Sequence, residues 1–473
     1  MHPSQLSNPR RHPIPYQVMA LAFGLSLAPS AEAARTFVHP GALDSEEELQ
    51  FVKAKIALGA QPWTAQFTRL KTTASGGSNA LITINSADGD ANISKGDARR
   101  AYASALVWKY TGQESYATRA LTILNDWSNL EGFTAGTDQD KLQAGWIGAL
   151  FAPAAEIMRG HPGWTAENIA KFQAMFRRAF YPQLVTMSKW NGNVDLTQID
   201  AMMSIAVFNE DDTLFQKGLQ RLAARNASYF HLTDSAVRPI SGDNGDIESF
   251  WSSPTKWVDG LTQETCRDNN HHAQYAMASA FHAAEVAWHQ GVDVYTPNQR
   301  RYTATLELMG KQIATGNMQG TCADDVTTSS RFATWEIGYN HYHNRMGLEL
   351  PNAWTAITEQ IRPKGVSDWN IFFETLTHGD LASTSGITPR QAGATGLRMR
   401  RQAKDRVEIM ASEAGRVDIL VSTLEGRKLE SLSVDLTAGE ASSVRLRTAT
   451  GPSGLRIVRA KTNQGETSLL LSN

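Results

Sequence analysis

Three polar segments carry side chains that can stabilise negative charge and move protons. They span residues 190–193 (WNGN), 266–272 (CRDNNHH) and 331–345 (RFATWEIGYNHYHNR). Amide and imidazole groups can stabilise an anion that develops during a reaction, and a phenol can accept and return a proton. We expect an Asn, a His, an Arg and one or two Tyr from these segments to converge in one cleft.

Helical spacing decides which of these side chains can meet, because residues three and four apart share a helix face. The third segment would place on one face Trp335, Tyr339, Tyr342 and Met346. The second segment and the helix after it would place on one face His271, Tyr275, Ala278 and His282.

Most of the chain has the pattern of paired helices, separated by Gly, Pro or Asn-Asp breaks. The expected helices cover 97–127 (two helices joined at Thr111-Gly112), 143–160, 166–180, 196–208, 213–229 and 272–289. Successive helix pairs predict a mainly α fold over residues 34–385, an (α/α) toroid or a solenoid. After residue 385, apolar residues alternate with polar ones between Gly-containing turns, which predicts a small antiparallel β-sandwich over 390–473.

The β domain has no aromatic residue, since the last one in the chain is Phe373. Sugar-binding modules normally use exposed aromatic side chains, so we expect a structural, interaction or export role for this domain. The polar stretch 235–270 is long for a loop, and long loops in compact domains are usually functional. Its Trp251 and Trp257 either stack on sugar rings or belong to the core.

The N-terminal residues 1–33 have the features of a secretory signal peptide. Arg10 and Arg11 precede an apolar stretch at 18–28, and the small-x-small sequence 31–33 follows. No later stretch is apolar enough to cross a bilayer, so a secreted or periplasmic protein is expected. In such a compartment the two cysteines, Cys266 and Cys322, would form a disulfide rather than remain free thiols.

The charge balance argues against nucleic acid as a partner. The formal net charge is −2 over 473 residues, so no general polyanion-binding surface is indicated. An acidic substrate would need a local group of cations.

Several of these motifs, in this order, resemble those of the alginate-lyase-type polysaccharide lyases, within which the chain looks closest to lyases of glucuronan or mannuronan. The resemblance spans roughly residues 36–365 and rests on 36–41 (TFVHPG), 191–193 (NGN), 267–271 (RDNNH), 285–295 (EVAWHQGVDVY) and 335–342 (WEIGYNHY). It implies an (α/α) toroid, an acidic polysaccharide as partner, and an Asn/His/Tyr/Arg active site. The sequence departs from the family at Val194, where Trp is expected, and at Asn269-Asn270, where Gln-Gly is usual; both bear on substrate preference.

The reaction that the resemblance implies is β-elimination at a β-1,4-linked uronate. Asn193 and His271 would hydrogen-bond the carboxylate and stabilise the charge that develops when the C5 proton leaves. A Tyr made more acidic by a nearby Arg would take that proton and return it to the C4 oxygen, which lies on the same side of the ring. We assign this role to Tyr339 with Tyr342 in reserve, and the nearby cation to Arg331 with Arg345 as the alternative.

The expected substrate-binding residues around this centre are Trp251, Trp257, Asn191, Asn270, His272 and Arg345. Each assignment has a structural alternative: Asn193 as a helix cap, His271 or His272 as a buried structural histidine, the tyrosines as core residues, and Arg331 as a salt-bridge partner.

Three other functions remain open from the sequence. A glycoside hydrolase on the same fold would need two carboxylates across the bond, from Asp243, Asp246, Glu248 or Asp268. A metal enzyme would draw on His271, His272, His341 and His343, but these lack a carboxylate partner in a recognised motif, so neither a metal nor another cofactor is expected. A non-catalytic polysaccharide-binding protein is the third. The polymer, the endo or exo mode of attack and the oligomeric state are not fixed by the sequence.

Overall fold

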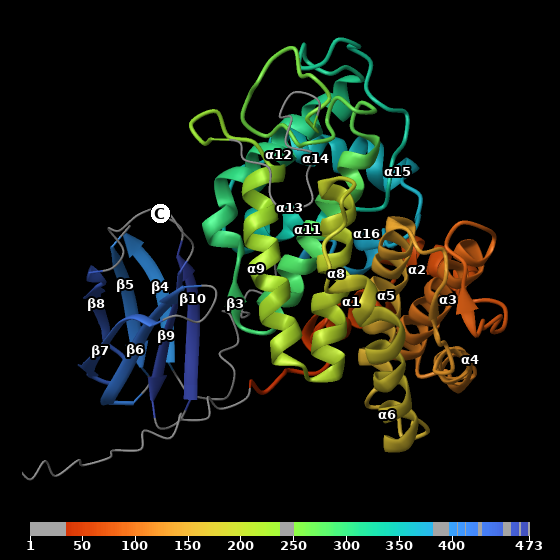
Figure 1. Ribbon diagram of the computed structural model, residues 1–473, viewed down its shortest axis with the longest axis horizontal. Coiled ribbons are helices and arrows are strands. Elements are labelled where there is room, and N and C mark those ends of the chain that lie inside the picture. The colour runs from red at the N-terminus through yellow and green to blue at the C-terminus, as the bar shows by residue number, and fades with distance from the viewer. Residues whose placement is uncertain are drawn as a thin grey trace, which may run out of the picture. The chain divides into compact units, whose positions relative to one another are not determined.

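The computed structural model describes residues 35–236 and 250–381 of a helical part and, in a C-terminal β part, 397–403, 405–411, 413–423, 428–447, 456–462 and 465–471. Figure 1 shows helices in the first part and strands in the second. The segment 1–33, expected to be a signal peptide, lies outside the described residues. Among the described residues, no helix is both long and apolar enough to span a bilayer.

The long helices are α1 (Glu46–Ala57), α2 (Trp63–Thr73), α3 (Asp90–Thr111), α4 (Glu114–Trp127), α5 (Asp138–Met158), α6 (Ala166–Met175), α8 (Gly192–Asn209), α9 (Asp212–Tyr229), α11 (His271–His289) and α12 (Tyr295–Thr315). The short ones are α7 (Tyr181–Leu184), α13 (Glu336–Tyr339), α14 (Pro351–Ala356), α15 (Arg362–Lys364) and α16 (Glu374–Thr377). Every expected helix is confirmed, and Gly112 in the left-handed conformation ends α3 where the break was predicted.

Three segments adopt the wider π-helix: η1 (Phe176–Phe180), η2 (Asn340–Arg345) and η3 (Ile357–Ile361). The second lies inside the segment 331–345 and directly continues α13. A π-turn adds a residue to the turn, so it rotates every later side chain away from its α-helical position. The face predicted for Tyr339 and Tyr342 therefore does not exist.

The inner helices α5, α8 and α11 are buried on nearly all sides because they are surrounded by other helices. Every residue of α8 is buried, as is every residue of α5 from Gln143 onwards. Small residues let these helices approach closely: a Cβ added at Gly148 would lie 3.0 Å from the Cβ of Ala201 and 3.1 Å from Ile205. Outer helices such as α4 bury one face only.

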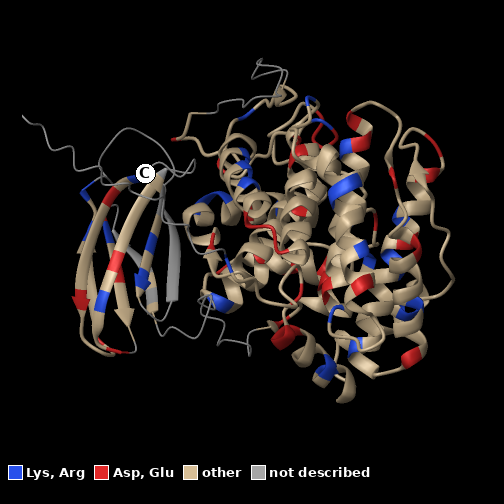
Figure 2. Cartoon of the chain, turned by 60° about the horizontal axis from the view of Figure 1, so that its bottom comes forward, with Lys and Arg blue, Asp and Glu red and all other residues tan. Residues whose placement is uncertain are grey.

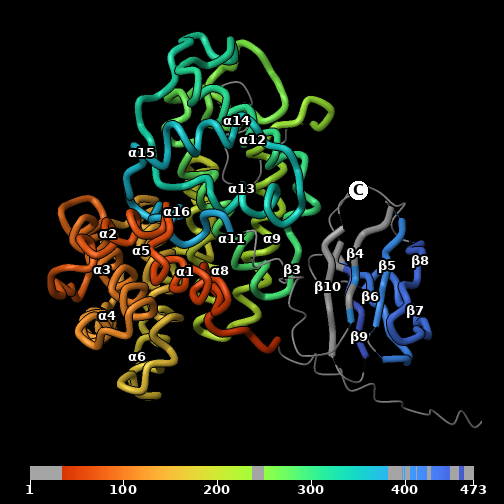
Figure 3. The backbone as a smooth tube through the Cα atoms, turned by 180° about the vertical axis from the view of Figure 1, so that it is seen from behind, coloured from red at the N-terminus to blue at the C-terminus, as the bar shows by residue number. Residues whose placement is uncertain are grey.

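Neighbouring inner helices run parallel, which brings their N-termini to one end of the toroid. Along α8 and α11, Thr197 contacts Ser279 (Oγ1–Oγ 3.3 Å) and, one turn later on both helices, Asp200 contacts His282 (Oδ2–Nδ1 3.1 Å). Figures 1 and 3 show α3, α5, α8 and α11 succeeding one another around the helical part. We call the end formed by their first turns the mouth of the toroid.

The β part is built from β4 (Leu397–Ala403), β5 (Arg406–Ala411), β6 (Gly415–Thr423), β7 (Lys428–Leu436), β8 (Ala441–Arg445), β9 (Arg456–Thr462) and β10 (Gly465–Leu471). One sheet has the order β3-β10-β9-β6-β7, where β3 (Val292–Asp293) belongs to the helical part, and the other has the order β4-β5-β8. Within each sheet the strands are antiparallel except for the β3–β10 pair. A third, two-stranded sheet pairs β1 (Thr83–Ile84) with β2 (Gly132–Phe133) in parallel.

The β part has its own hydrophobic core, which follows from the alternation of apolar and polar residues along its strands. Val417, Ile419 and Val421 of β6 are buried and join residues of both sheets in one apolar cluster. The prediction of a mainly α fold followed by a small antiparallel β domain is confirmed. Figure 2 shows acidic and basic residues interspersed over the described chain, as the near-zero net charge predicts.

Candidate active site

The segment 190–193 positions one amide at the mouth, on the first turn of α8. Asn191 is the N-cap, its side chain accepting from the backbone N–H of Val194 at 3.2 Å. Gly192 lies so close to Tyr229 that an added Cβ would be 2.3 Å from its ring, so only glycine fits. Asn193, the next residue, is 2% exposed, and its Oδ1 has no hydrogen-bond partner among the described residues. The capping role belongs to Asn191, and Asn193 is left with an unused polar group.

The disulfide between Cys266 and Cys322, predicted from the sequence, is present and fixes the entry to α11. Asn270 is fully buried there, with a left-handed backbone and its Nδ2 donating to Gln312 Oε1 at 2.7 Å. Asn270 thus anchors the turn through Nδ2, while its Oδ1 has no hydrogen-bond partner among the described residues, so its contact with substrate stays a prediction. His271 follows it, half-buried, with Nδ1 2.8 Å from Ser330 Oγ.

Burial and the neighbouring His272 lower the pKa of His271, which keeps its imidazole neutral near pH 7. His272 is half-buried and closely paired with Asp268 four residues earlier. It lies at the same end of α11 as His271, with ring centroids 5.2 Å apart.

Tyr275 follows one turn after His271 and is the phenol that the structure places at the mouth. Its hydroxyl donates to Asp368 Oδ2 at 3.1 Å, and its ring lies 4.3 Å from that of Trp369. Because Thr197 and Ser279 are in contact, the residues one turn earlier, Asn193 and Tyr275, face each other across the two parallel helices. Burial and then Asp368 raise the pKa of Tyr275, so its hydroxyl is protonated in this arrangement.

Two cations of α3 complete the group. Lys95 is 8% exposed, with its Nζ 5.2 Å from the ring centroid of Trp146 and 5.5 Å from that of Trp369. Arg99 is half-buried and donates to the carbonyl of Ser367 at 2.7 Å. Burial lowers the pKa of both groups and Asp368 opposes that effect. Within the described ranges, neither cation forms an ion pair with a carboxylate.

We call the set at this end the mouth site. Its members are Lys95, Arg99, Trp146, Asn193, His271, Tyr275, Asp368 and Trp369. It combines cations without ion pairs, an unused amide, a neutral imidazole and a phenol, which are the groups that a negatively charged substrate and a proton transfer require.

Arg331 lies beside the mouth site but is held by backbone carbonyls. Its guanidinium donates to the carbonyls of Thr328 (2.6 Å) and Ser330 (2.9 Å), and Ser330 is the residue that contacts His271. Burial lowers its pKa. The salt-bridge alternative does not hold within the described residues; Arg331 supports the loop that orients His271.

The two tyrosines proposed as the base lie elsewhere. Tyr342 is fully buried, and its hydroxyl donates to the carbonyl of Tyr295 at 2.9 Å, so it is a core residue. Tyr339 lines a separate pocket of about 400 Å³ with His343, Asn344, Glu349, Leu350, Pro351, Trp354 and Asp380. Burial, then Asp380 and Glu349, raise the pKa of Tyr339 to about 12. The carboxylates outweigh the one nearby cation, Arg362, so the surroundings of Tyr339 do not favour a role as the base.

Burial also argues against substrate contact by Trp251 and Arg345. Trp251 is 1% exposed and packs on Trp257 at 5.4 Å between ring centroids, so it cannot offer a face to a sugar. Trp257 is partly exposed but belongs to the same small apolar cluster. Arg345 is buried in ion pairs with Glu48 and Glu285 and cannot bind substrate.

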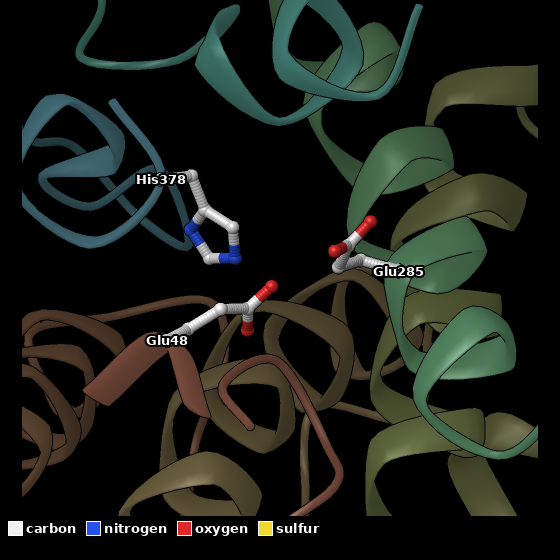
Figure 4. A group of neighbouring side chains, drawn as sticks. All are labelled: Glu48, Glu285 and His378. Atoms are coloured by element: carbon white, nitrogen blue, oxygen red, sulfur yellow. The ribbon is translucent and has the colours of Figure 1, made fainter. Parts of the chain in front are cut away.

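The Arg345 network lies near the other end of α11, about 20 Å from His271 at 1.5 Å per residue. Figure 4 shows Glu48 of α1, Glu285 of α11 and His378, which follows α16, pointing toward one another. Their ligand atoms lie within 4.8 Å of one another, as metal ligands would. Both carboxylates, however, already have cationic partners: Arg345 Nη2 lies 2.8 Å from Glu48 and 2.6 Å from Glu285, and His289 Nε2 lies 3.0 Å from Glu48.

We therefore interpret this group as an ion-pair network that joins α1, α11 and η2. The histidines considered as metal ligands, His271, His272, His341 and His343, do not assemble with carboxylates into such a group in the described ranges. Of the carboxylates considered for a hydrolase, Asp243, Asp246 and Glu248 lie outside the described residues. Asp268 is paired with His272.

Because of this network, we expect the folding stability to decrease as the pH rises above neutrality. Burial lowers the pKa of His289, but Glu48 and Glu285 outweigh it and raise that pKa to about 10. A histidine whose folded pKa exceeds its unfolded value of 6.5 contributes fully below pH 6.5, and this contribution is lost as pH rises through 10. We expect the urea midpoint to fall between pH 6.5 and pH 10, and to fall less in His289→Gln. Equal slopes in both proteins would show that His289 is not charged in the folded chain.

Comparison with known proteins agrees with this description. The family model "Alginate lyase" matches residues 75–229, which contain Lys95, Arg99, Trp146 and Asn193. No curated protein sequence matches the chain. Among solved structures, alginate lyase A1-III from Sphingomonas species A1 is similar with 15% identity and a TM-score of 0.51, covering 72% of this chain and 99% of that one.

Two further structures have lower scores. A variant of alginate lyase A1-III complexed with a tetrasaccharide has 16% identity and a TM-score of 0.49, covering 72% of this chain and 99% of that one. An alginate lyase from Bacteroides ovatus has 15% identity and a TM-score of 0.44, covering 58% of this chain and 84% of that one.

The fold is an α/α toroid, and the match to the alginate lyase model over 75–229 indicates an enzyme of the polysaccharide lyase class. More narrowly, the alginate lyase family model matches residues 75–229 of the 473, and the toroid is shared with A1-III; both findings agree with the resemblance seen in the motifs.

Proposed function

We propose that this protein cleaves a β-1,4-linked uronic-acid polysaccharide, polymannuronate or glucuronan, by β-elimination and leaves an unsaturated uronate end. The observation that carries the proposal is the pair of cations in the mouth site, the buried Lys95 and the half-buried Arg99, which lack carboxylate ion pairs among the described residues. Buried charges normally have partners. A polymer with one carboxylate per sugar residue would supply them.

The same residues account for the chemistry. Asn193 and His271 would hydrogen-bond the carboxylate of the reacting uronate and stabilise the charge that develops when the C5 proton leaves. Tyr275 takes the place first assigned to Tyr339 as the base. Arg99, which favours the ionised form of Tyr275, takes the place first given to Arg331. Because the C5 proton and the C4 oxygen lie on the same side of the ring, Tyr275 can pass the proton to the leaving oxygen.

The test is an absorbance assay at the ultraviolet band of unsaturated uronates, run on polymannuronate, polyguluronate, glucuronan and hyaluronan. We expect the band to grow with polymannuronate or glucuronan and not with polyguluronate, whose C5 proton has the other orientation. Release of reducing ends without the band would identify a hydrolase instead. Binding without either signal would identify a polysaccharide-binding protein.

Removing either carboxylate-binding group should lower turnover without unfolding the chain. Loss of one preorganised donor to a developing anion typically costs about 10²–10³-fold in kcat. We expect Asn193→Ala and His271→Ala each to show a loss of this size in the absorbance assay. Asn191→Ala, which removes the helix cap two residues before Asn193, should lower stability by about 1 kcal/mol and leave kcat within a few-fold. Full activity in both site variants would contradict the proposed site.

We further propose that the chain is secreted or periplasmic. The support is the signal-like sequence at 1–33 together with the Cys266–Cys322 disulfide, which suits an oxidising compartment. N-terminal sequencing of the exported protein should find a start just after residue 33, and an uncleaved chain retained in the cytoplasm would contradict this.

A further inference from the structure

The loop 366–371 places a carboxylate and a flat ring side by side in the mouth site. Asp368 Oδ2 accepts from the Tyr275 hydroxyl at 3.1 Å. The ring of Trp369 stacks on that of Trp146, with centroids 4.0 Å apart and planes inclined by 20°. A uronate residue presents the same two features, a carboxylate and a ring with a flat apolar face.

We propose that Lys95, Arg99 and Trp146 form a binding subsite for one uronate residue, and that Asp368 and Trp369 fill this subsite in the unliganded chain as an internal mimic of the sugar. The inference rests on the proposed function and extends it: it names the residues that hold the sugar and the groups that must leave first.

Electrostatics supports the carboxylate half of the mimic. Asp368 attracts both Lys95 and Arg99, and it opposes the effect of burial on each of them. Buried cations need a counter-charge. In the unliganded chain Asp368 supplies it without reaching ion-pair distance to either cation. A substrate carboxylate can take over this role and come closer.

The positions of Lys95 and Trp146 support the second part of the mimic, in which the Trp369 ring takes the place of the sugar ring. The Nζ of Lys95 lies 5.2 Å from the centroid of Trp146 and 5.5 Å from that of Trp369, so the ammonium faces both rings of the stack. If Trp369 withdraws, Trp146 keeps an apolar face with a cation at its edge. Such a face suits the C–H side of a pyranose that carries a carboxylate.

Access to Tyr275 requires this exchange. Tyr275 has 0% exposure, because Trp369 lies on its ring at 4.3 Å and Phe332 at 4.5 Å. A sugar can contact the Tyr275 hydroxyl only after Asp368 and Trp369 have moved.

The loop is anchored on both sides of Trp369, and Asp368 and Ile371 also exchange backbone hydrogen bonds of 3.1 and 2.7 Å. On one side Val366 pairs with the 331–333 segment, its N–H donating to the carbonyl of Arg331 at 3.0 Å. On the other side Asn370 is buried and donates to Ser279 Oγ at 3.0 Å. Between these anchors Trp369 has a φ of 44°, a left-handed conformation that is costly for a bulky residue. Leaving that conformation offsets part of the lost stacking.

The test is the affinity for a saturated mannuronate or glucuronate tetramer, measured by calorimetry under conditions in which turnover is blocked by low temperature. Removing an internal competitor raises the competent fraction and lowers the apparent Kd in proportion. We expect Asp368→Asn and Trp369→Ala each to bind at least about tenfold more tightly than the wild type. Lys95→Met should bind at least about tenfold more weakly. Glu349→Gln, which alters an exposed carboxylate in the Tyr339 pocket, should not change the Kd.

Unchanged or weaker binding by both Asp368→Asn and Trp369→Ala, in variants whose circular dichroism matches the wild type, would overturn the inference. A second readout is the tryptophan fluorescence of the wild type, which should change when the tetramer separates Trp369 from Trp146 and should not change with a neutral tetramer of glucose. Because these are binding measurements, they stand apart from the lyase assay. Tighter binding by the variants without an unsaturated product from the wild type would support the subsite and overturn the proposed function. An unsaturated product without tighter binding would support the proposed function and overturn the subsite.

Discussion

Tyr275→Phe is expected to lower kcat by roughly 10²–10⁴-fold, the usual contribution of general acid–base catalysis. The substitution removes one oxygen and keeps the ring, which packs against Phe332 and Trp369, so the fold and the polymer-binding groups remain. The substrate still meets Lys95 and Arg99, and KM should therefore change much less than kcat. Initial rates of unsaturated uronate formation over a range of polymer concentrations give both constants.

The matched control is the same substitution at Tyr339, the residue that the sequence favoured as the base. Tyr339 lies among Glu349 and Asp380 in its own pocket, and the phenylalanine variant should keep kcat within a few-fold. The opposite pattern, an active Tyr275→Phe and an inactive Tyr339→Phe, would return the site to the segment 331–345.

Arg345→Met should destabilise the chain by about 3–5 kcal/mol, because it leaves buried carboxylates without their cation. Arg345 has only 9% side-chain exposure and joins Glu48 to Glu285, which are 1% and 0% exposed. The measurement is the free energy of unfolding from urea titration at pH 7. Activity per folded molecule should stay near the wild-type level, since the network lies far from the mouth site along α11.

The control for this variant is Arg300→Met. Arg300 pairs with Asp234 and Asp259, but its side chain is 55% exposed, and exposed ion pairs contribute only about 0–1 kcal/mol. An equally small effect at Arg345 would mean that its ion pairs with Glu48 and Glu285 do not stabilise the fold.

Much of the fold could be predicted because its signals are local. The apolar faces, the Gly112 break and the alternation in β6 each depend on neighbours in sequence, and each is confirmed. The Asn-Gly-Asn segment was also informative, since each residue type has a separate local task at the start of α8. Cys266 and Cys322 could be paired because the expected compartment left few alternatives.

The prediction of Tyr339 as the catalytic base depended on a regular α-helix, and the sequence does not show that this helix becomes a π-helix. A helix over 331–345 would place Tyr339 and Tyr342 on one face, but the π-helix η2 begins at Asn340 and rotates the side chains after that point. Tyr342 then enters the core and Tyr339 faces another pocket. The alternative was visible, because Tyr275 shares the helix face of His271, four residues earlier.

The remaining members of the mouth site could not be found from the sequence. Lys95 and Arg99 follow the spacing of an ordinary solvated helix face, and their tertiary contacts, with Trp369 and with the carbonyl of Ser367, come from more than 250 residues later. Asp368 and Trp369 stand in a segment without a motif. Trp251 and Trp257 had the stronger composition signal, yet they pack on each other. Only the tertiary contacts distinguish this pair from Trp146 and Trp369, which belong to the mouth site.

A crystal structure of Tyr275→Phe with a mannuronate or glucuronate tetrasaccharide tests the central claim most directly. The account predicts a sugar at the N-termini of α3, α5, α8 and α11. One carboxylate should lie within hydrogen-bond distance of Asn193 and His271, and its C5 should face the ring of residue 275. A tetrasaccharide bound around Tyr339, or anywhere that leaves Asn193 and His271 without contact, would contradict it.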